Sequence, residues 1–244
     1  MKNLLVLFIL AASFQAYGQE SALLRTNYSE GDVYEIKMIQ KTSTGIQGGT
    51  DMTMMMDMEV TEVTDELIET KSKISSIAMD MNQGGMSMSY DSSQSDEELD
   101  ATGKMLKSQL SPMMDAVIFN TMDVYGNTLN TTVEPAIKGM EQFTAGQSAI
   151  NYPKEEVSVG SYWTSDNEKQ GMNVKTTYTV TKIADGMVYL DIKGDVSGAG
   201  TGSMKGASEI EISTGLAKNT DTEITVTTQG IEVTVASQIQ MTKK

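Results

Sequence analysis

Methionine is the residue whose number and spacing in this sequence most clearly suggest a binding function. The chain of 244 residues has 20 methionines and neither histidine nor cysteine. Eight of the methionines alternate with other residues in two segments: Met52, Met54, Met56, Met58, Met79, Met81, Met86 and Met88. Because a thioether is soft, flexible and polarizable, such rows could hold Cu(I) or form an adaptable wall for an apolar ligand.

The missing residue types exclude most catalytic layouts. Without imidazole or thiol the chain lacks the commonest general base, the commonest metal ligand and the best nucleophile. The acidic clusters lack the spacing of a calcium loop, and no predicted helix follows the glycines of 194–206 to hold a phosphate. We therefore expect no enzyme, no cofactor and no metal site. Those glycines are better explained as a bend or bulges where a strand curls.

A predicted hairpin positions the second methionine segment. Gly84-Gly85 separates two alternating runs, and Gly-Gly is a favoured two-residue hairpin loop. This loop pairs Gln83 with Met86, Met81 with Met88 and Met79 with Tyr90. Cross-strand partners share a face of the sheet, so these thioethers and the phenol lie together. We name the candidate ligand-binding residues the predicted methionine face: Met54, Met56, Met79, Met81, Met86, Met88 and Tyr90.

Three interpretations of this face remain open. It could be ordinary core, a wall for an acyl chain, lipid or other apolar ligand, or a soft-metal site, the last disfavoured because thioethers are weak ligands. A second predicted hairpin, at Gln229-Gly230, pairs Ile224 with Val235 and Val226 with Val233 as a conventional core face. Because β-branched side chains pack one way and methionine repacks, the contrast favours an adaptable surface in the first half.

The elements that carry these residues are mainly β-strands. Val, Ile, Thr, Ser and Met recur at period two between Gly, Asn and Asp, which is typical of antiparallel structure. Ser95 and Glu98 form a capping box that predicts a helix over about 96–111, ending near Pro112, and a weaker pattern predicts a helix over 135–143. We expect a single curled antiparallel sheet, a half-barrel or open barrel, with one or two helices packed on it.

Two pairs of segments suggest an internal repeat. Residues 30–34 and 159–163 each place a glycine before an aromatic-led strand, and residues 60–68 match 180–188 in apolar pattern. Pseudo-repeated halves would then cover about 28–130 and 155–244. Because no Pro-rich or Ser-rich linker separates them, we expect residues 19–244 to form one domain.

The N-terminus predicts export. Residues 1–18 combine a positive n-region, a short apolar stretch and a small-x-small cleavage site, so we expect cleavage before Gln19. Cysteine is absent, so the chain cannot be lipidated at a cysteine or form disulfides. We expect an exported protein, periplasmic or secreted, soluble and not membrane-spanning. A net charge of −15 disfavours nucleic acid as a partner, and the oligomeric state stays undetermined.

The second half resembles an uncharacterised family of secreted Bacteroidota proteins of unknown function. The likeness rests on Gly160 to Trp163, Val180 to Gly186 and the glycine-spaced stretch leading into 209–216. It covers mainly 155–244, with weaker echoes in 28–75. The expected architecture is also similar to that of half-barrel lipoprotein carriers and their lipid-binding envelope relatives, in which the concave face holds acyl chains.

These observations favour an exported, non-enzymatic protein that binds an apolar ligand or acylated partner on its methionine-lined sheet face. The alternative is a structural or protein-interaction component of the cell envelope whose methionines are core. An open, concave methionine face would favour the first function, and a face closed by packing would favour the second.

Overall fold

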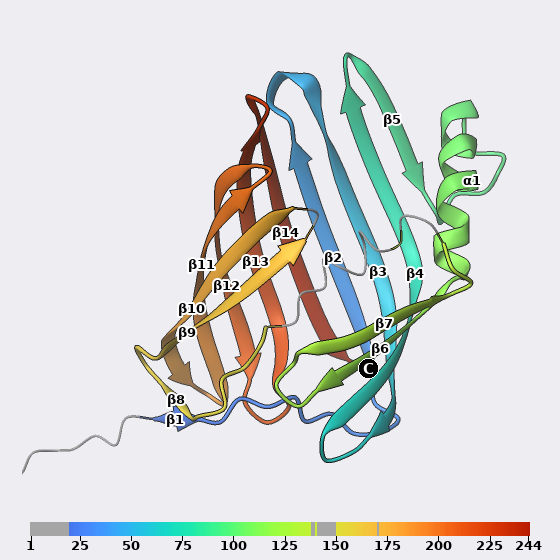
Figure 1. The fold of residues 1–244 in the computed structure, drawn as a ribbon. Coiled ribbons are helices and arrows are strands. Elements are labelled where there is room, and N and C mark those ends of the chain that lie inside the picture. Colours follow the sequence, from blue (N-terminus) through green and yellow to red (C-terminus); the bar gives the residue numbers. More distant parts are fainter. Residues whose placement is uncertain (1–19, 138–139, 141–149, 170) are drawn as a thin grey trace, which may run out of the picture.

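A single antiparallel sheet dominates the computed structural model, which describes residues 20–137, 140, 150–169 and 171–244. The sheet has twelve strands and curls into an open half-barrel (Figure 1). Eleven strands follow in spatial order: β7 (Thr128–Glu134), β6 (Val117–Asp123), β4 (Leu67–Gln83), β3 (Gly48–Val63), β2 (Val33–Ser43), β14 (Ile231–Lys243), β13 (Leu216–Thr228), β12 (Thr201–Glu211), β11 (Met187–Gly198), β10 (Met172–Ala184) and β9 (Tyr162–Lys169).

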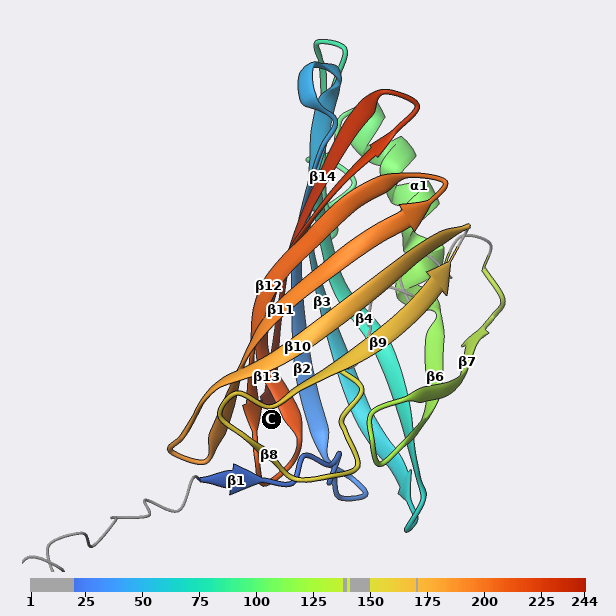
Figure 2. The same ribbon diagram turned by 60° about the vertical axis from the view of Figure 1, so that its left-hand side comes forward.

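The remaining elements lie at the edges and the foot of the sheet. β5 (Met86–Asp91) pairs with the end of β4 that β6 leaves free. β1 (Ser21–Ala22) and β8 (Val157–Ser158) form a separate two-stranded sheet at the lower end in Figure 1. A short 3-10 turn, Gly45–Gln47, joins β2 to β3. The two sheet edges, β7 and β9, do not pair with each other, and Figure 2 shows the open side between them.

Both predicted hairpins are confirmed in register. Met81 pairs with Met88 and Met79 with Tyr90 across Gly84-Gly85, whose φ angles are 60° and 84°. The second hairpin turns at Gln229 and Gly230 with φ angles of 52° and 80°. Positive φ at both central positions gives a turn whose twist matches the strands on either side.

Glycines, which have no side chain, allow neighbouring strands to approach closely in the curled part of the sheet. The register places Gly194, Gly202 and Gly206 on the concave face of β11 and β12. A Cβ atom at Gly202 would lie 1.9 Å from the carbonyl oxygen of Thr225, and one at Gly206 would lie 2.3 Å from that of Asp221. Only glycine permits this close approach of the neighbouring backbone.

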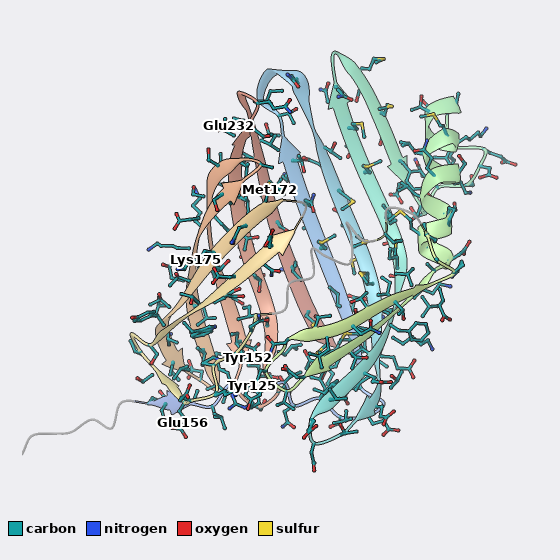
Figure 3. All side chains as sticks on the ribbon, in the orientation of Figure 1. Tyr125, Tyr152, Glu156, Met172, Lys175 and Glu232 are labelled. Atoms are coloured by element: carbon teal, nitrogen blue, oxygen red, sulfur yellow. The ribbon has the colours of Figure 1, made fainter. Side chains whose placement is uncertain are left out.

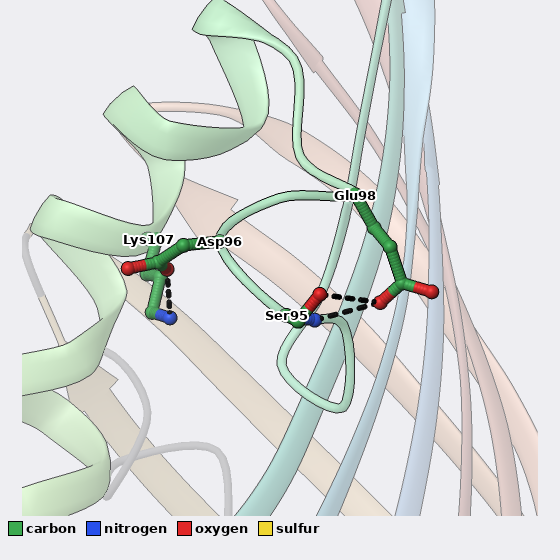
Figure 4. Close-up of polar contacts among 4 residues, drawn as sticks. All are labelled: Ser95, Asp96, Glu98 and Lys107. Atoms are coloured by element: carbon green, nitrogen blue, oxygen red, sulfur yellow. Dashed lines mark hydrogen bonds and ion pairs between the residues drawn. The ribbon is translucent and has the colours of Figure 1, made fainter.

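The predicted helix exists, but it begins and ends later. α1 (Ala101–Asp115) is capped by Asp100, whose side chain accepts a hydrogen bond of 2.7 Å from the backbone N–H of Gly103. Ser95 and Glu98 do bond each other, but both donors of Ser95 reach one oxygen of Glu98 and close a separate turn (Figure 4). The predicted cap and the predicted end at Pro112 were therefore wrong, since Pro112 lies within the helix.

The second predicted helix, over 135–143, falls mostly outside the described residues: of its described part, 135–137 are not helical, whereas Met140 is. Residues 1–18, the predicted export signal, also lie outside the described residues.

The predicted repeat has a local structural counterpart. Gly31 donates its N–H to the carbonyl of Val60, whose own N–H donates to Asp32, both at 2.9 Å. Gly160, Val180 and Ser161 form the same two bonds at the same length. A β-bulge follows each valine, after Val60 in β3 and after Val180 in β10. The two segments therefore share turn geometry as well as apolar pattern.

Candidate functional site

Two residues of the predicted methionine face belong to the largest core cluster. Met54 and Met56 are each 1% exposed and belong to one buried cluster with Ile77 of β4 and Met113 of α1. α1 packs on β4 and β5, so the helix borders this part of the concave face. Side chains closed in by packing offer no surface to a ligand, which argues against a binding role for Met54 and Met56.

The other five residues of the face lie along β4 and β5. Tyr90 is buried in a small cluster with Leu99 and Leu106, against which Met79 and Met88 pack partly buried. Met81 is half-buried, and Met86, beside the hairpin loop, is 71% exposed. The register brings the five together as predicted, but none of them lines the cavities described below.

The concave face instead encloses two adjoining cavities farther along the sheet. The wall cavity has a volume of about 330 Å³ and lies over the strands from β9 to β14 and β2. The foot cavity, of about 160 Å³, lies nearer the lower end, between these strands and β6. Ile150, Thr220 and Ile239 line both cavities, so together they form one trough.

Six methionines line this trough, and none belongs to the predicted methionine face. Three line the wall cavity and three the foot cavity, in this order: Met38, Met172, Met204, Met58, Met122 and Met241. Ile224 and Val235, predicted as conventional core, also line the wall cavity and are only half-buried. The interpretation of that hairpin as closed core was therefore wrong, although its register was right.

No ionised side chain among the described residues lines either cavity. Charge lies instead on the convex face, because strand side chains alternate between faces. There a depression of about 630 Å³ is lined by Lys41, Lys205, Asp191, Asp221 and Glu223, among others. Lys205 pairs with Glu223 at 2.8 Å and Lys41 with Asp51 at 3.7 Å. The convex depression is thus a solvated, charge-compensated surface, and the trough is the better candidate site.

Side chains from distant segments close the foot of the trough. Tyr152 donates its buried hydroxyl to the carbonyl of Gly215 at 2.7 Å and its N–H to the carbonyl of Tyr125 at 2.8 Å. Arg25 lies over the ring of Tyr125 at 4.4 Å and donates to the carbonyls of Leu24, Pro153 and Lys154. Figure 3 shows Tyr125 and Tyr152 near this lower end. The foot is therefore fixed by hydrogen bonds as well as by packing.

Tyr28 brings a partly buried phenol to the foot cavity. Its ring packs on Tyr34 with centroids 5.0 Å apart, and burial raises its pKa far above the ordinary value. Tyr34 donates to Asp32 at 3.1 Å, and Asp32 pairs with Lys243 at 2.7 Å. The hydroxyl of Tyr28, in contrast, has no hydrogen-bond partner among the described residues.

Asn120 brings an amide to the same cavity. Its oxygen accepts a 2.7 Å hydrogen bond from the hydroxyl of Thr131, which leaves the amide N–H groups to donate elsewhere. Thr70, directly across the β4–β6 pair from Asn120, and Ser72 are buried hydroxyls without a partner. An unsatisfied buried polar group costs about 1–3 kcal/mol. The hydroxyls of Thr70 and Ser72 therefore lack hydrogen bonds that would stabilise the protein.

The sole tryptophan of the chain lies beside the trough. Trp163 opens β9, donates its indole N–H to the carbonyl of Asn151 at 2.7 Å and stacks on Tyr178 with centroids 5.5 Å apart. Tyr178 lines the wall cavity. These contacts hold Trp163 at the start of β9, and the ring is placed to report on the wall cavity.

Comparison with known proteins identifies no activity. Residues 138–243, which include β8 to β14, match the model of a family of unknown function (DUF6263). This match agrees with the predicted resemblance of 155–244 to an uncharacterised family. A structure of MucB in complex with MucA(peri) aligns with 9% identity and a TM-score of 0.15, over 86% of this chain and 89% of that one. No curated protein matches the sequence.

The described part of the chain contains no helix with the length and apolar character that crossing a bilayer requires.

Proposed function

We propose that this protein is an exported, non-enzymatic carrier that binds an apolar ligand in the trough on the concave face of its sheet. The observation that supports this most directly is the pair of adjoining cavities, of about 330 and 160 Å³, lined without a single charge by described residues. Ligand pockets are typically concave and mostly apolar, with a few polar groups that orient the ligand. The trough has each of these properties.

The energetics favour a chain-like ligand. Each methylene group that moves from water into an apolar site contributes roughly 0.8 kcal/mol. A trough formed by two joined cavities offers such burial along its length, whereas the convex face offers exposed charge. Methionine on the walls suits an acyl chain or lipid of varying shape, because its side chain repacks at low cost.

A titration tests the proposal. N-phenylnaphthylamine, a neutral apolar fluorophore, should bind saturably, and the emission of Trp163 should change as the wall cavity fills. Val174→Phe puts a larger side chain into that cavity from β10 and should weaken binding about tenfold. Asn173→Phe is the matched control, because the neighbouring residue is exposed and lies on the opposite face. Equal affinity of both variants would contradict the site.

Two sets of methionine substitutions separate the trough from the predicted methionine face. Leucine at Met38, Met172, Met204 and Met241 should narrow the range of apolar ligands bound, since leucine is the stiffer side chain. Leucine at Met79, Met81, Met86 and Met88 should leave binding unchanged, because these residues line neither cavity of the trough. Each leucine is expected to cost less than about 1.5 kcal/mol, and circular dichroism checks that both variants are folded before binding is compared.

The second candidate function is a structural or protein-interaction component of the cell envelope. It is favoured by the packing of Met54 and Met56, which makes part of the predicted methionine face ordinary core. Two results together would favour this second function. N-phenylnaphthylamine would show no saturable binding, and native mass spectra of protein purified from its host would show no bound lipid.

A further inference from the structure

We infer that the ligand carries an uncharged hydrogen-bond acceptor, an ester or amide carbonyl, which the foot cavity holds at Tyr28 and Asn120 while the hydrocarbon chain extends into the wall cavity. This inference rests on the proposed function and adds the chemical class of the ligand to it. A carboxylate, a phosphate and a bare hydrocarbon would all be poorer ligands.

The hydrogen-bond donors that line the foot cavity indicate which kind of polar group the ligand carries. Tyr28 has a hydroxyl without a partner, and the amide of Asn120 has its oxygen occupied by Thr131 and its N–H groups left over. Both groups line the same small cavity and have a hydrogen-bond donor to spare. A carbonyl oxygen accepts two hydrogen bonds, so it is the polar group that suits these two donors.

The lack of cationic side chains among the described lining residues indicates that the polar group of the ligand is uncharged. No lysine or arginine among the described residues lines the foot or wall cavity. The basic side chains of the surrounding segments are engaged elsewhere: Arg25 donates to backbone carbonyls, Lys243 pairs with Asp32, and Lys218 pairs with Glu211 at 2.7 Å. An anionic head group in the foot cavity would have no cation beside it, which is unfavourable.

The shape of the trough orients the ligand. The foot cavity is the smaller of the two, and the hydrogen bond from Tyr152 to Gly215 fixes its floor. The wall cavity is larger, and its apolar lining residues, among them Met38, Met204 and Ile224, are interspersed with uncharged polar ones such as Gln40 and Asn167. The small polar end fits the foot and the hydrocarbon fits the wall.

Displacement of N-phenylnaphthylamine by three ligands of equal chain length tests the inference. Methyl laurate presents a neutral carbonyl, laurate at neutral pH presents a carboxylate, and dodecane presents neither. We expect methyl laurate to bind about tenfold more tightly than laurate, and about fivefold more tightly than dodecane. Laurate binding as tightly as its methyl ester, or dodecane binding as tightly as either, would overturn the inference.

Paired substitutions test the placement of the carbonyl. Tyr28→Phe removes the free hydroxyl and should lower the affinity for methyl laurate about fivefold. The affinity for dodecane should stay unchanged. Asn120→Leu should act in the same direction. Tyr178→Phe makes the same chemical change in the wall cavity and should leave the preference for the ester intact. Loss of the preference in Tyr178→Phe alone would place the carbonyl in the wall cavity and contradict the assignment.

The two proposals fail in different ways. If neither N-phenylnaphthylamine nor any of the three ligands binds, the proposed function itself is wrong. If the probe and dodecane bind but the ester has no advantage, the trough still binds apolar molecules and only the inference about the ligand's polar end is wrong.

Discussion

Three tyrosines near the foot of the sheet differ in what their hydroxyl groups meet. Tyr34 donates to Asp32, Tyr152 donates to the carbonyl of Gly215, and Tyr28 has no partner among the described residues. For all three, burial is the main cause that raises the pKa of the phenol above its ordinary value of 10.0. The folded protein therefore holds these protons more tightly than the unfolded chain does.

The higher pKa of these phenols in the folded protein than in the unfolded chain predicts that the protein loses stability at alkaline pH. When the folded pKa is the higher one, unfolding releases protons, so the free energy of unfolding is constant below the unfolded pKa and falls as pH rises above about 10. Chemical denaturation across this range should show the decline. Tyr152→Phe should lose about 1–3 kcal/mol at neutral pH, because the carbonyl of Gly215 loses its donor, yet decline less steeply. A curve that stays flat well above pH 10 in the wild type would contradict the assignment.

The methionines of β3 and β5 should differ sharply in their contribution to stability. Met54→Ala leaves a cavity in the core cluster that includes Met113 of α1 and should cost about 2–5 kcal/mol, because Met54 is fully buried. Met86→Ala, at the exposed end of the hairpin, should stay within about 0.5 kcal/mol of the wild type. Urea denaturation of both variants measures the difference, and comparable losses would show that the packing under α1 is not as described.

At the scale of elements, the hairpins were predictable and the start of the helix was not. A two-residue loop fixes the register of both strands, so the pairs across Gly84-Gly85 follow from counting. The bonds between Ser95 and Glu98 suit an isolated turn as well as a helix start. Burial of Leu99 against Leu106 accompanies the later start, and that tertiary contact cannot be read from local sequence.

Two alanine substitutions distinguish the real cap from the apparent one. Asp100→Ala removes the acceptor of the Gly103 N–H and should destabilise the protein by about 1 kcal/mol. Ser95→Ala removes only one of the two donors to Glu98 in an exposed turn and should have a smaller effect. The free energy of unfolding measures both. A larger loss for Ser95→Ala would show that the helix starts where the sequence alone suggests.

At the scale of the whole molecule, the alternation of side chains predicted a sheet with two faces, but not which part of the concave face stays open. Met54 and Met38 lie directly opposite each other on β3 and β2, yet only Met38 lines a cavity. The difference depends on where α1 docks and where glycines tighten the curl. Both are long-range features, so the sequence located a methionine-rich face but not the trough.

The export prediction also belongs to this scale. Protein recovered from the periplasm or the medium of its host should have the intact mass of a chain that begins at Gln19. Retention of the full chain in the cytoplasm would contradict both the predicted signal and the proposed location.

The strands follow one another around the sheet in chain order, and the first long strand closes against the last. β2 pairs with β14, so Lys37 lies opposite Gln240, and the backbone N–H of Lys244 donates to the carbonyl of Val33 at 2.8 Å. During synthesis β2 is made early and its partner last, which leaves one edge of β2 unpaired while the rest of the chain is produced. Contacts so distant in sequence form slowly. The joining of β2 to β14 should therefore limit the rate of folding, and until it occurs the nascent sheet has an open edge to which a second chain could add.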